Sequence, residues 1–99
     1  MIYNNVILTA KDINDVETIA SLLAEQAERS MTEPGCVRFE VFQSESDPKV
    51  FMLIETWETQ AHLDDHRNAD AFQNLYVPKL IPLVDRTPHP SSRLYPADE

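Results

Sequence analysis

The stretch VFMLIETWETQAHLDDH (Val50–His66) contains an apolar strand that leads directly into a helix. Its first five residues are all apolar, which is typical of a strand covered on both faces. Thr59 belongs to the residue types that most often cap the N-terminus of a helix. We therefore expect a strand before Thr59 and a helix after it, and we expect Pro78 and Pro82 to break that helix because proline disturbs helical hydrogen bonding.

The remaining strands are predicted on either side of this central strand. GCVRFEVFQ (35–43) alternates in side-chain type and should pair with the central strand as an antiparallel hairpin across the turn SESDPK. YNNVILTA (3–10) is rich in β-branched and aromatic residues and predicts a first strand. In the proline-rich tail, SRLY (92–95) predicts a short last strand.

A long amphipathic helix is predicted between the first strand and the hairpin. Apolar residues recur at helical spacing from Ile13 to Met31. Asn14 followed by Glu17 resembles a capping box at the start, and Pro34-Gly35 would end the helix.

The order strand, helix, hairpin, helix, strand predicts a ferredoxin-like α+β fold. In that fold two helices cover one face of a four-stranded antiparallel sheet. We expect residues 1–99 to form a single domain, with the tail 86–99 supplying the last strand and contacting a partner subunit.

Strand alternation divides the sheet residues between two faces. Beneath the helices we expect Val37, Phe39, Val41, Val50, Met52 and Ile54. On the opposite face we expect Asn5, Ile7, Thr9, Arg38, Glu40, Phe42, Phe51, Leu53, Glu55 and Trp57. This second face is too apolar to be exposed and too polar for a dry core, so we expect a homodimer that packs sheet against sheet around a ligand cavity.

Composition excludes several classes of partner. The formal net charge of −9 repels phosphate backbones and anionic membranes, so we expect neither nucleic acid nor membrane binding. No apolar run reaches membrane-spanning length and the N-terminus lacks the features of a signal peptide, so we expect a cytoplasmic protein. The only glycine, Gly35, cannot build a glycine-rich phosphate loop, and the only cysteine, Cys36, has little basic surrounding to activate it.

His62 and His66 stand four residues apart on one helix face, a spacing that zinc sites use. The pair lacks the adjacent glutamate of a metalloprotease, and Asp64 and Asp65 fit a solvated acidic face equally well. We therefore expect no metal, and we expect His62 to be exposed. His66 could act as a proton-transfer group beside Trp57, or it could only hydrogen-bond a strand carbonyl.

Glu55 needs a partner if it is buried, and the expected hairpin register places Arg38 opposite it. We expect a structural ion pair between them, and the alternative is that Glu55 is an active carboxylate. Asn5 could hydrogen-bond an oxygen atom of a ligand, or it could hydrogen-bond only backbone groups.

Three segments, EPGCVRFEVFQ, FMLIETWETQAHLDDH and ADAF, together resemble the antibiotic biosynthesis monooxygenase domain family. The resemblance implies a ferredoxin-like homodimer, a dimeric α/β barrel. It implies catalytic roles for His66, Trp57 and Asn5. It implies a substrate-binding set of Arg38, Phe51, Leu53, Glu55, Phe72 and Tyr76.

Departures from the family pattern separate its branches. Haem-degrading members share Asn5 but have tryptophan at His66 and an iron-ligating histidine at Tyr76. Polyketide monooxygenases usually have asparagine at Leu53, and the quinol monooxygenases and sugar-derivative isomerases often have a second histidine at Ala71. The quinol monooxygenase and sugar-derivative isomerase branches are more similar, through WETQAHLDDH and RFEVFQ respectively.

The leading hypothesis is therefore a monooxygenase without any cofactor that oxidises a quinol or other dihydroxy-aromatic molecule with dioxygen. His66 would be the base, and Asn5 and Trp57 would orient the substrate and the oxygen adduct. One alternative is an isomerase of a small phosphorylated carbonyl compound, for which only Arg38 and Arg67 are nearby cations. Another is a dimeric binding or stress protein without turnover.

Overall fold

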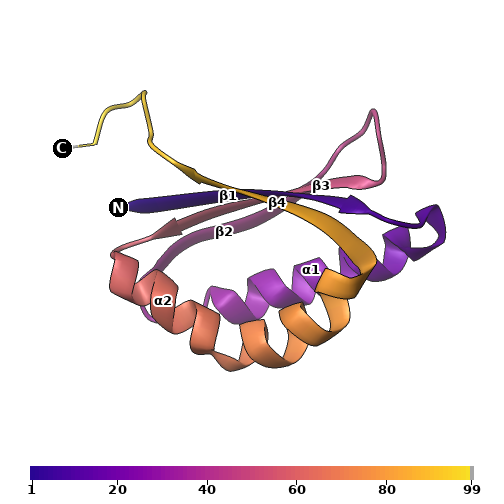
Figure 1. Cartoon of the computed structure of the whole chain (residues 1–99). Coiled ribbons are helices and arrows are strands. Elements are labelled where there is room, and N and C mark those ends of the chain that lie inside the picture. The colour runs from indigo at the N-terminus through magenta and orange to yellow at the C-terminus, as the bar shows by residue number, and fades with distance from the viewer. Residues whose placement is uncertain (99) are drawn as a thin grey trace.

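Four antiparallel strands form one sheet in the computed structural model, which describes residues 1–98 (Figure 1). The strands are β1 (Ile2–Ala10), β2 (Cys36–Gln43), β3 (Val50–Trp57) and β4 (Val84–Ser91). Their order across the sheet is β2-β3-β1-β4, so β1 and β3 are central. This arrangement confirms the predicted ferredoxin-like α+β fold.

The helical segments lie between β1 and β2 and between β3 and β4, and they cover one face of the sheet (Figure 1). They are the 3₁₀ turn η1 (Ile13–Asp15), α1 (Val16–Ser30), α2 (Gln60–Asn68), the π-helix η2 (Ala71–Leu80) and the 3₁₀ turn η3 (Ile81–Leu83). None of the helices within residues 1–98 is both long and apolar enough to cross a membrane.

Side chains at the helix starts fix the entry into each helical segment. Asp12, rather than the expected Asn14, caps the first segment, and its carboxylate accepts a hydrogen bond from the Asn14 amide at 2.9 Å. Thr59 caps α2 as predicted, because its hydroxyl oxygen accepts from the His62 amide at 3.2 Å.

The second helical segment is broken as predicted, but at a different residue. Ala69 is extended, with φ −80° and ψ 164°, and it separates α2 from η2. Pro78 lies inside η2 without ending it, and Pro82 lies in η3.

The last strand lies earlier than the predicted segment 92–95. β4 pairs with β1 over Val84–Ser91, and Pro88 and Pro90 both lie within it. An edge strand needs backbone donors on only one side, so it tolerates proline where a central strand would not.

The facing of β3 is the opposite of the prediction. Phe51, Leu53, Glu55 and Trp57 are buried beneath the helices, each with at most 4% of its surface exposed. Val50, Met52 and Ile54 instead share the open face with the correctly predicted Asn5, Ile7, Thr9, Arg38, Glu40 and Phe42. Because β3 is apolar at consecutive positions, hydrophobicity alone does not decide which face is buried.

One further error lies in β2. Phe39 and Val41 face the helices as predicted, but Val37 is exposed. A register irregularity between Cys36 and Arg38 takes Val37 out of the strand alternation.

Gly35 occupies a position that no other residue type would fill without strain. Its φ of 78° lies in the left-handed region, and a Cβ atom there would lie 2.1 Å from Cγ of His62. The Gly35 carbonyl also accepts a hydrogen bond from the Glu58 amide at 2.8 Å. The turn before β2 is thereby packed against the start of α2.

We predict that Gly35→Ala lowers the free energy of unfolding by about 1–3 kcal/mol, because the substitution adds both backbone strain and a steric conflict. Urea denaturation followed by circular dichroism measures the change. The double variant Gly35→Ala/His62→Ala should recover part of the loss, since it removes the steric conflict but not the strain. Equal stability of Gly35→Ala and wild type would contradict this account.

Candidate active site between the sheet and the helices

A small cavity lies between the helix-covered face of the sheet and the helices α2 and η2. Its lining combines apolar and aromatic side chains with five polar or charged ones: Asn4, Phe39, Leu53, Glu55, Leu63, His66, Arg67, Phe72, Tyr76 and Arg86. The free space is about 10 Å³, which is about the room that one water molecule needs. An organic ligand would therefore have to displace lining side chains.

His66 is the central polar group of this cavity. Although it lies on the polar helix α2, only 4% of its surface is exposed. Its Nδ1 lies 2.7 Å from Oε1 of Glu33, a residue of the turn that precedes β2. Within residues 1–98 no hydrogen bond involves Nε2 of His66, so this nitrogen can form a hydrogen bond with a molecule in the cavity. A carboxylate at Nδ1 fixes the orientation of the ring.

Three aromatic rings surround the His66 imidazole. The ring centroids of Trp57, Phe72 and Phe39 lie 4.6, 5.5 and 5.8 Å from that of His66. These rings restrict the access of water to the imidazole.

Glu55 is a buried carboxyl on β3, at the wall of the same cavity. The Trp57 indole donates a hydrogen bond from Nε1 to Oε1 of Glu55 at 3.1 Å. Burial raises the pKa of Glu55 above its ordinary value, and the Trp57 hydrogen bond and the nearby His66 and Arg86 offset only part of that rise.

Tyr76 and Arg86 form a pair at another part of the cavity wall. Nε of Arg86 donates to the Tyr76 hydroxyl at 2.8 Å, and its guanidinium carbon lies 5.8 Å from the centroid of the tyrosine ring. Burial raises the pKa of Tyr76, and the charge of Arg86 partly opposes this rise. The tyrosine hydroxyl therefore stays protonated at neutral pH.

The structure brings most of the expected site residues together. Leu53, Glu55, His66, Phe72 and Tyr76 line the cavity, and Trp57 contacts His66 and Glu55.

Three expected site residues lie elsewhere. Phe51 is in the core and does not line the cavity, while Asn5 and Arg38 lie on the open face of the sheet. The predicted Arg38–Glu55 ion pair is wrong: Arg38 lies opposite Thr56 in the sheet and its Nε binds Glu40 at 2.7 Å.

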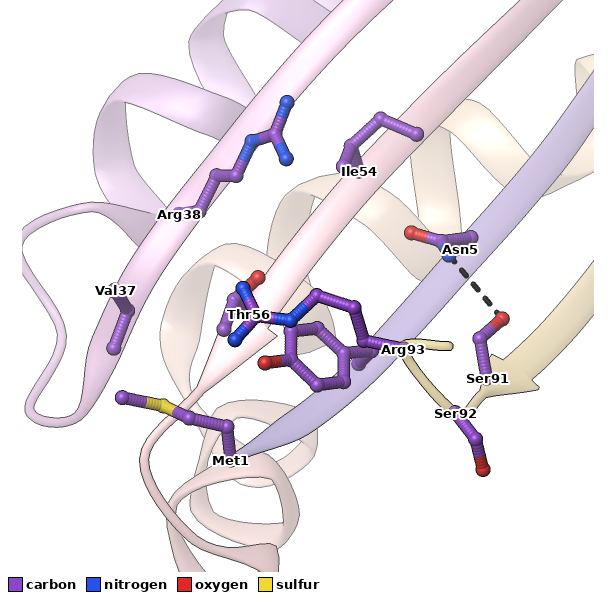
Figure 2. Close-up of a pocket in the computed structure, with 10 residues that line it drawn as sticks. Met1, Asn5, Val37, Arg38, Ile54, Thr56, Ser91, Ser92 and Arg93 are labelled. Carbon is purple, nitrogen blue, oxygen red and sulfur yellow. Dashed lines mark hydrogen bonds between the residues drawn. The ribbon is translucent and has the colours of Figure 1, made fainter. Parts of the chain in front are cut away.

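The open face carries a separate hollow of about 410 Å³ (Figure 2). The Asn5 amide donates to the Ser91 hydroxyl at 3.2 Å across β1 and β4. Arg93 lies with its guanidinium carbon 5.3 Å from the centroid of the Tyr3 ring. Figure 2 shows Arg38 on the opposite side of the hollow from Asn5 and Ser91. Asn5 and Arg38 are thus separated by the sheet from His66.

Sequence reasoning missed three polar residues of the site. Asn4, rather than its neighbour Asn5, lines the cavity beside Glu55, because strand alternation turns only Asn4 toward the helices. Glu33 was recognisable only as part of the motif EPG, and its contact with His66 spans 33 positions. Arg86 lies in a segment that was expected to belong to the tail.

The histidine pair does not converge on one centre. His62 is partly buried rather than exposed as predicted, and its Nδ1 lies 2.8 Å from the Thr59 hydroxyl, whereas Nδ1 of His66 is held by Glu33. Among residues 1–98 no group of three or more His, Cys, Asp or Glu side chains is arranged to hold a metal ion. Burial, with the nearby Glu33 and Glu55 charges, raises the pKa of Cys36 to about 11, so its thiol is protonated at neutral pH.

Comparisons of the sequence and the fold with known proteins identify related proteins. The family model described as "Antibiotic biosynthesis monooxygenase" matches residues 1–76. A conserved protein of unknown function from Bacteroides thetaiotaomicron superposes with a TM-score of 0.85 at 26% identity, covering 91% of this chain and 94% of that one. A crystal structure named antibiotic biosynthesis monooxygenase gives a TM-score of 0.82 at 24% identity, covering 93% and 98%. At 24% identity, the likeness to this last structure shows the fold alone.

An uncharacterized protein of Synechocystis sp. strain PCC 6803 is 36% identical over 54 residues. The matched segment covers 54% of this chain and 33% of that protein. The match therefore spans about a third of the length of that relative.

The raised pKa of Glu55 predicts a pH-dependent contribution to stability. A carboxyl with a folded-state pKa above its ordinary value of 4.5 stabilises the fold below that value, and the contribution is lost as the pH rises through the folded-state pKa. Glu55→Gln keeps an acceptor for the Trp57 indole but does not ionise. We predict that this variant gains stability relative to wild type between about pH 4 and about pH 8.

Urea unfolding of both proteins across this pH range measures the difference. Glu58→Gln, an exposed residue on the same chain segment, is the matched control and should show no such trend. A constant difference between Glu55→Gln and wild type at all pH values would refute the assignment.

Proposed function

Because the chain belongs to the antibiotic biosynthesis monooxygenase family, we propose that it oxidises an electron-rich quinol or dihydroxy-aromatic molecule with dioxygen and without a cofactor. The observation that carries the proposal is a buried imidazole, His66, held by Glu33 at Nδ1 and surrounded by aromatic rings. This arrangement suits the removal of a proton from a phenol in a site shielded from water.

The reaction begins when Nε2 of His66 accepts the phenol proton of the substrate. The resulting phenolate is electron-rich and transfers one electron to dioxygen. Recombination of the two radicals forms a C–O bond and, after protonation, a hydroperoxide. Loss of water from this C(H)–OOH group breaks the O–O bond and leaves a carbonyl. One oxygen atom then remains in the quinone, the other leaves as water, and all electrons come from the substrate.

The residues around His66 have supporting roles. Glu33 keeps the imidazole oriented through its contact with Nδ1. Asn4 takes the ligand-orienting role that was expected of Asn5, because Asn4 lines the cavity. The Trp57 indole, fixed by Glu55, forms one wall of the site. Phe72 is only partly buried, so it can turn outward to admit a substrate.

We predict that the wild-type protein consumes oxygen with a reduced quinone as substrate and no added metal, flavin or nicotinamide. His66→Ala should lower kcat about 10²–10⁴-fold, the usual contribution of a general base. Glu33→Gln should lower it less, because the amide still holds the ring at Nδ1 but no longer offsets the charge that forms on the imidazole when it accepts the proton. An oxygen electrode measures all three proteins.

His62→Ala is the matched control, since His62 lies on the same helix outside the cavity lining. Circular dichroism must show that each variant is folded. No uptake above the uncatalysed rate by wild type, across a panel of quinols, would exclude the oxygenase function. Full activity of folded His66→Ala would exclude His66 as the base.

We also propose that two copies of the chain pack through the open face of the sheet. This face exposes Ile7 and Phe42, with 40% and 47% of their surfaces accessible, next to the partly buried Met52 and Ile54. Apolar side chains that gather on one face are typical of an interface. Association of two identical sheets would bury this face without closing the cavity on the other side.

We predict a dimer at micromolar concentration by light scattering, and we predict that Phe42→Glu converts it to a monomer because a charge would then be buried in the interface. Val77→Glu is the control, since Val77 is similarly exposed, at 39%, but lies on η2 at the other face. A monomeric wild type, or a dimeric Phe42→Glu, would refute the proposed interface.

A further inference from the structure

The charge of the cavity differs in sign from that of the whole chain. The chain has eight lysine and arginine side chains and a formal net charge of −9. Nevertheless two of the eight, Arg67 from α2 and Arg86 from β4, line this one small cavity. Of the carboxyl groups in the described part of the chain, only that of Glu55 lines it.

Arg86 differs from the other arginines in its partners. Arg29, Arg38, Arg67 and Arg93 each lie within 4.0 Å of a carboxylate oxygen, whereas within residues 1–98 Arg86 has no such neighbour. Among the residues that the structure describes, its one side-chain hydrogen bond runs from Nε to the Tyr76 hydroxyl at 2.8 Å. A guanidinium has five N–H donors, so its two terminal nitrogens keep donors for a planar anion.

Glu55 does not neutralise Arg86 in the manner of an ion pair. No salt bridge joins the two side chains, and Oε1 of Glu55 already accepts a hydrogen bond from the Trp57 indole. Burial also shifts the Glu55 carboxyl toward its neutral form. The guanidinium is therefore the uncompensated charge of the cavity wall.

A row of rings leads from Arg86 to His66. The Tyr76 hydroxyl binds Arg86, the Phe72 centroid lies 5.2 Å from that of Tyr76, and His66 lies 5.5 Å beyond Phe72. These contacts connect Arg86 to His66 through Phe72, which a flat aromatic ligand would have to displace or stack on.

We propose that the substrate carries a carboxylate opposite its phenol, that Arg86 binds this carboxylate, and that the phenol is thereby placed at His66. The choice of a phenol rests on the proposed function, whereas the carboxylate follows from the unpaired guanidinium. Tyr76 acts as a positioning residue that fixes the guanidinium plane. Arg67 lies at the same cavity, but its Asp64 partner at 3.8 Å makes it the weaker anion-binding group.

A matched pair of ligands tests the carboxylate directly. 3,4-Dihydroxybenzoate and 3,4-dihydroxybenzamide have nearly the same shape and the same phenols, but only the first is an anion. Isothermal titration calorimetry under nitrogen measures their binding without turnover. We expect wild type to bind 3,4-dihydroxybenzoate at least about tenfold more tightly than 3,4-dihydroxybenzamide. A carboxylate accepts charge-assisted bidentate hydrogen bonds from a guanidinium, and these are stronger than hydrogen bonds to a neutral amide.

Variants identify the group responsible. Arg86→Met should bring the two affinities within about twofold of each other, and Arg86→Lys should retain part of the preference because it keeps the charge but not the planar fork. Arg29→Met is the control, since Arg29 lies on α1 outside the cavity and its loss should leave the preference unchanged. Arg86 is exposed, so its replacement should not unfold the chain, which circular dichroism verifies.

The outcomes separate the two proposals. Absence of the preference in wild type, or its persistence in folded Arg86→Met, overturns the carboxylate proposal even if quinols are oxidised. A preference that depends on Arg86 supports it even if no oxygen is consumed, in which case only the proposed oxidation fails.

Discussion

The pairing register of β3 with its two neighbours is the constraint on which the rest of the structure depends. It places Glu55 between Phe39 of β2 and Asn4 of β1, all facing the helices. Side chains alternate along a strand, so a shift of one residue would turn Glu55 and Trp57 to the opposite face. His66 would then lose the ring that packs nearest to it, and the cavity would lose its carboxyl.

The fold was predictable because its signals are local. Strand alternation, the Thr59 cap and the order of the elements each depend on neighbouring residues. The buried face of β3 was not predictable in the same way, since both of its faces are apolar. The predicted facing put Glu55 on the same side of the sheet as Arg38, and the expected ion pair followed from that error. In the structure the Glu55 carboxyl instead accepts a hydrogen bond from the indole of Trp57, two residues along the same strand.

The site was predictable only for residues that lie on one continuous segment. Glu55, Trp57 and His66 belong to the strand and helix that the central stretch encodes. Glu33 and Arg86 reach the cavity from a turn and from an edge strand, through contacts that depend on the whole topology. Local sequence patterns therefore do not reveal Glu33, which holds the imidazole, or Arg86, which is proposed to select the ligand.

Pro88 and Pro90 have a consequence beyond their own strand. They lie at alternate positions of β4, so both of their nitrogens point to the same side, away from β1. The outer border of the sheet thus lacks two successive hydrogen-bond donors, and a strand from another molecule could not extend the ladder there. The prolines protect the chain from open-ended polymerisation through this border, while they leave the flat side of the sheet available for a closed pair.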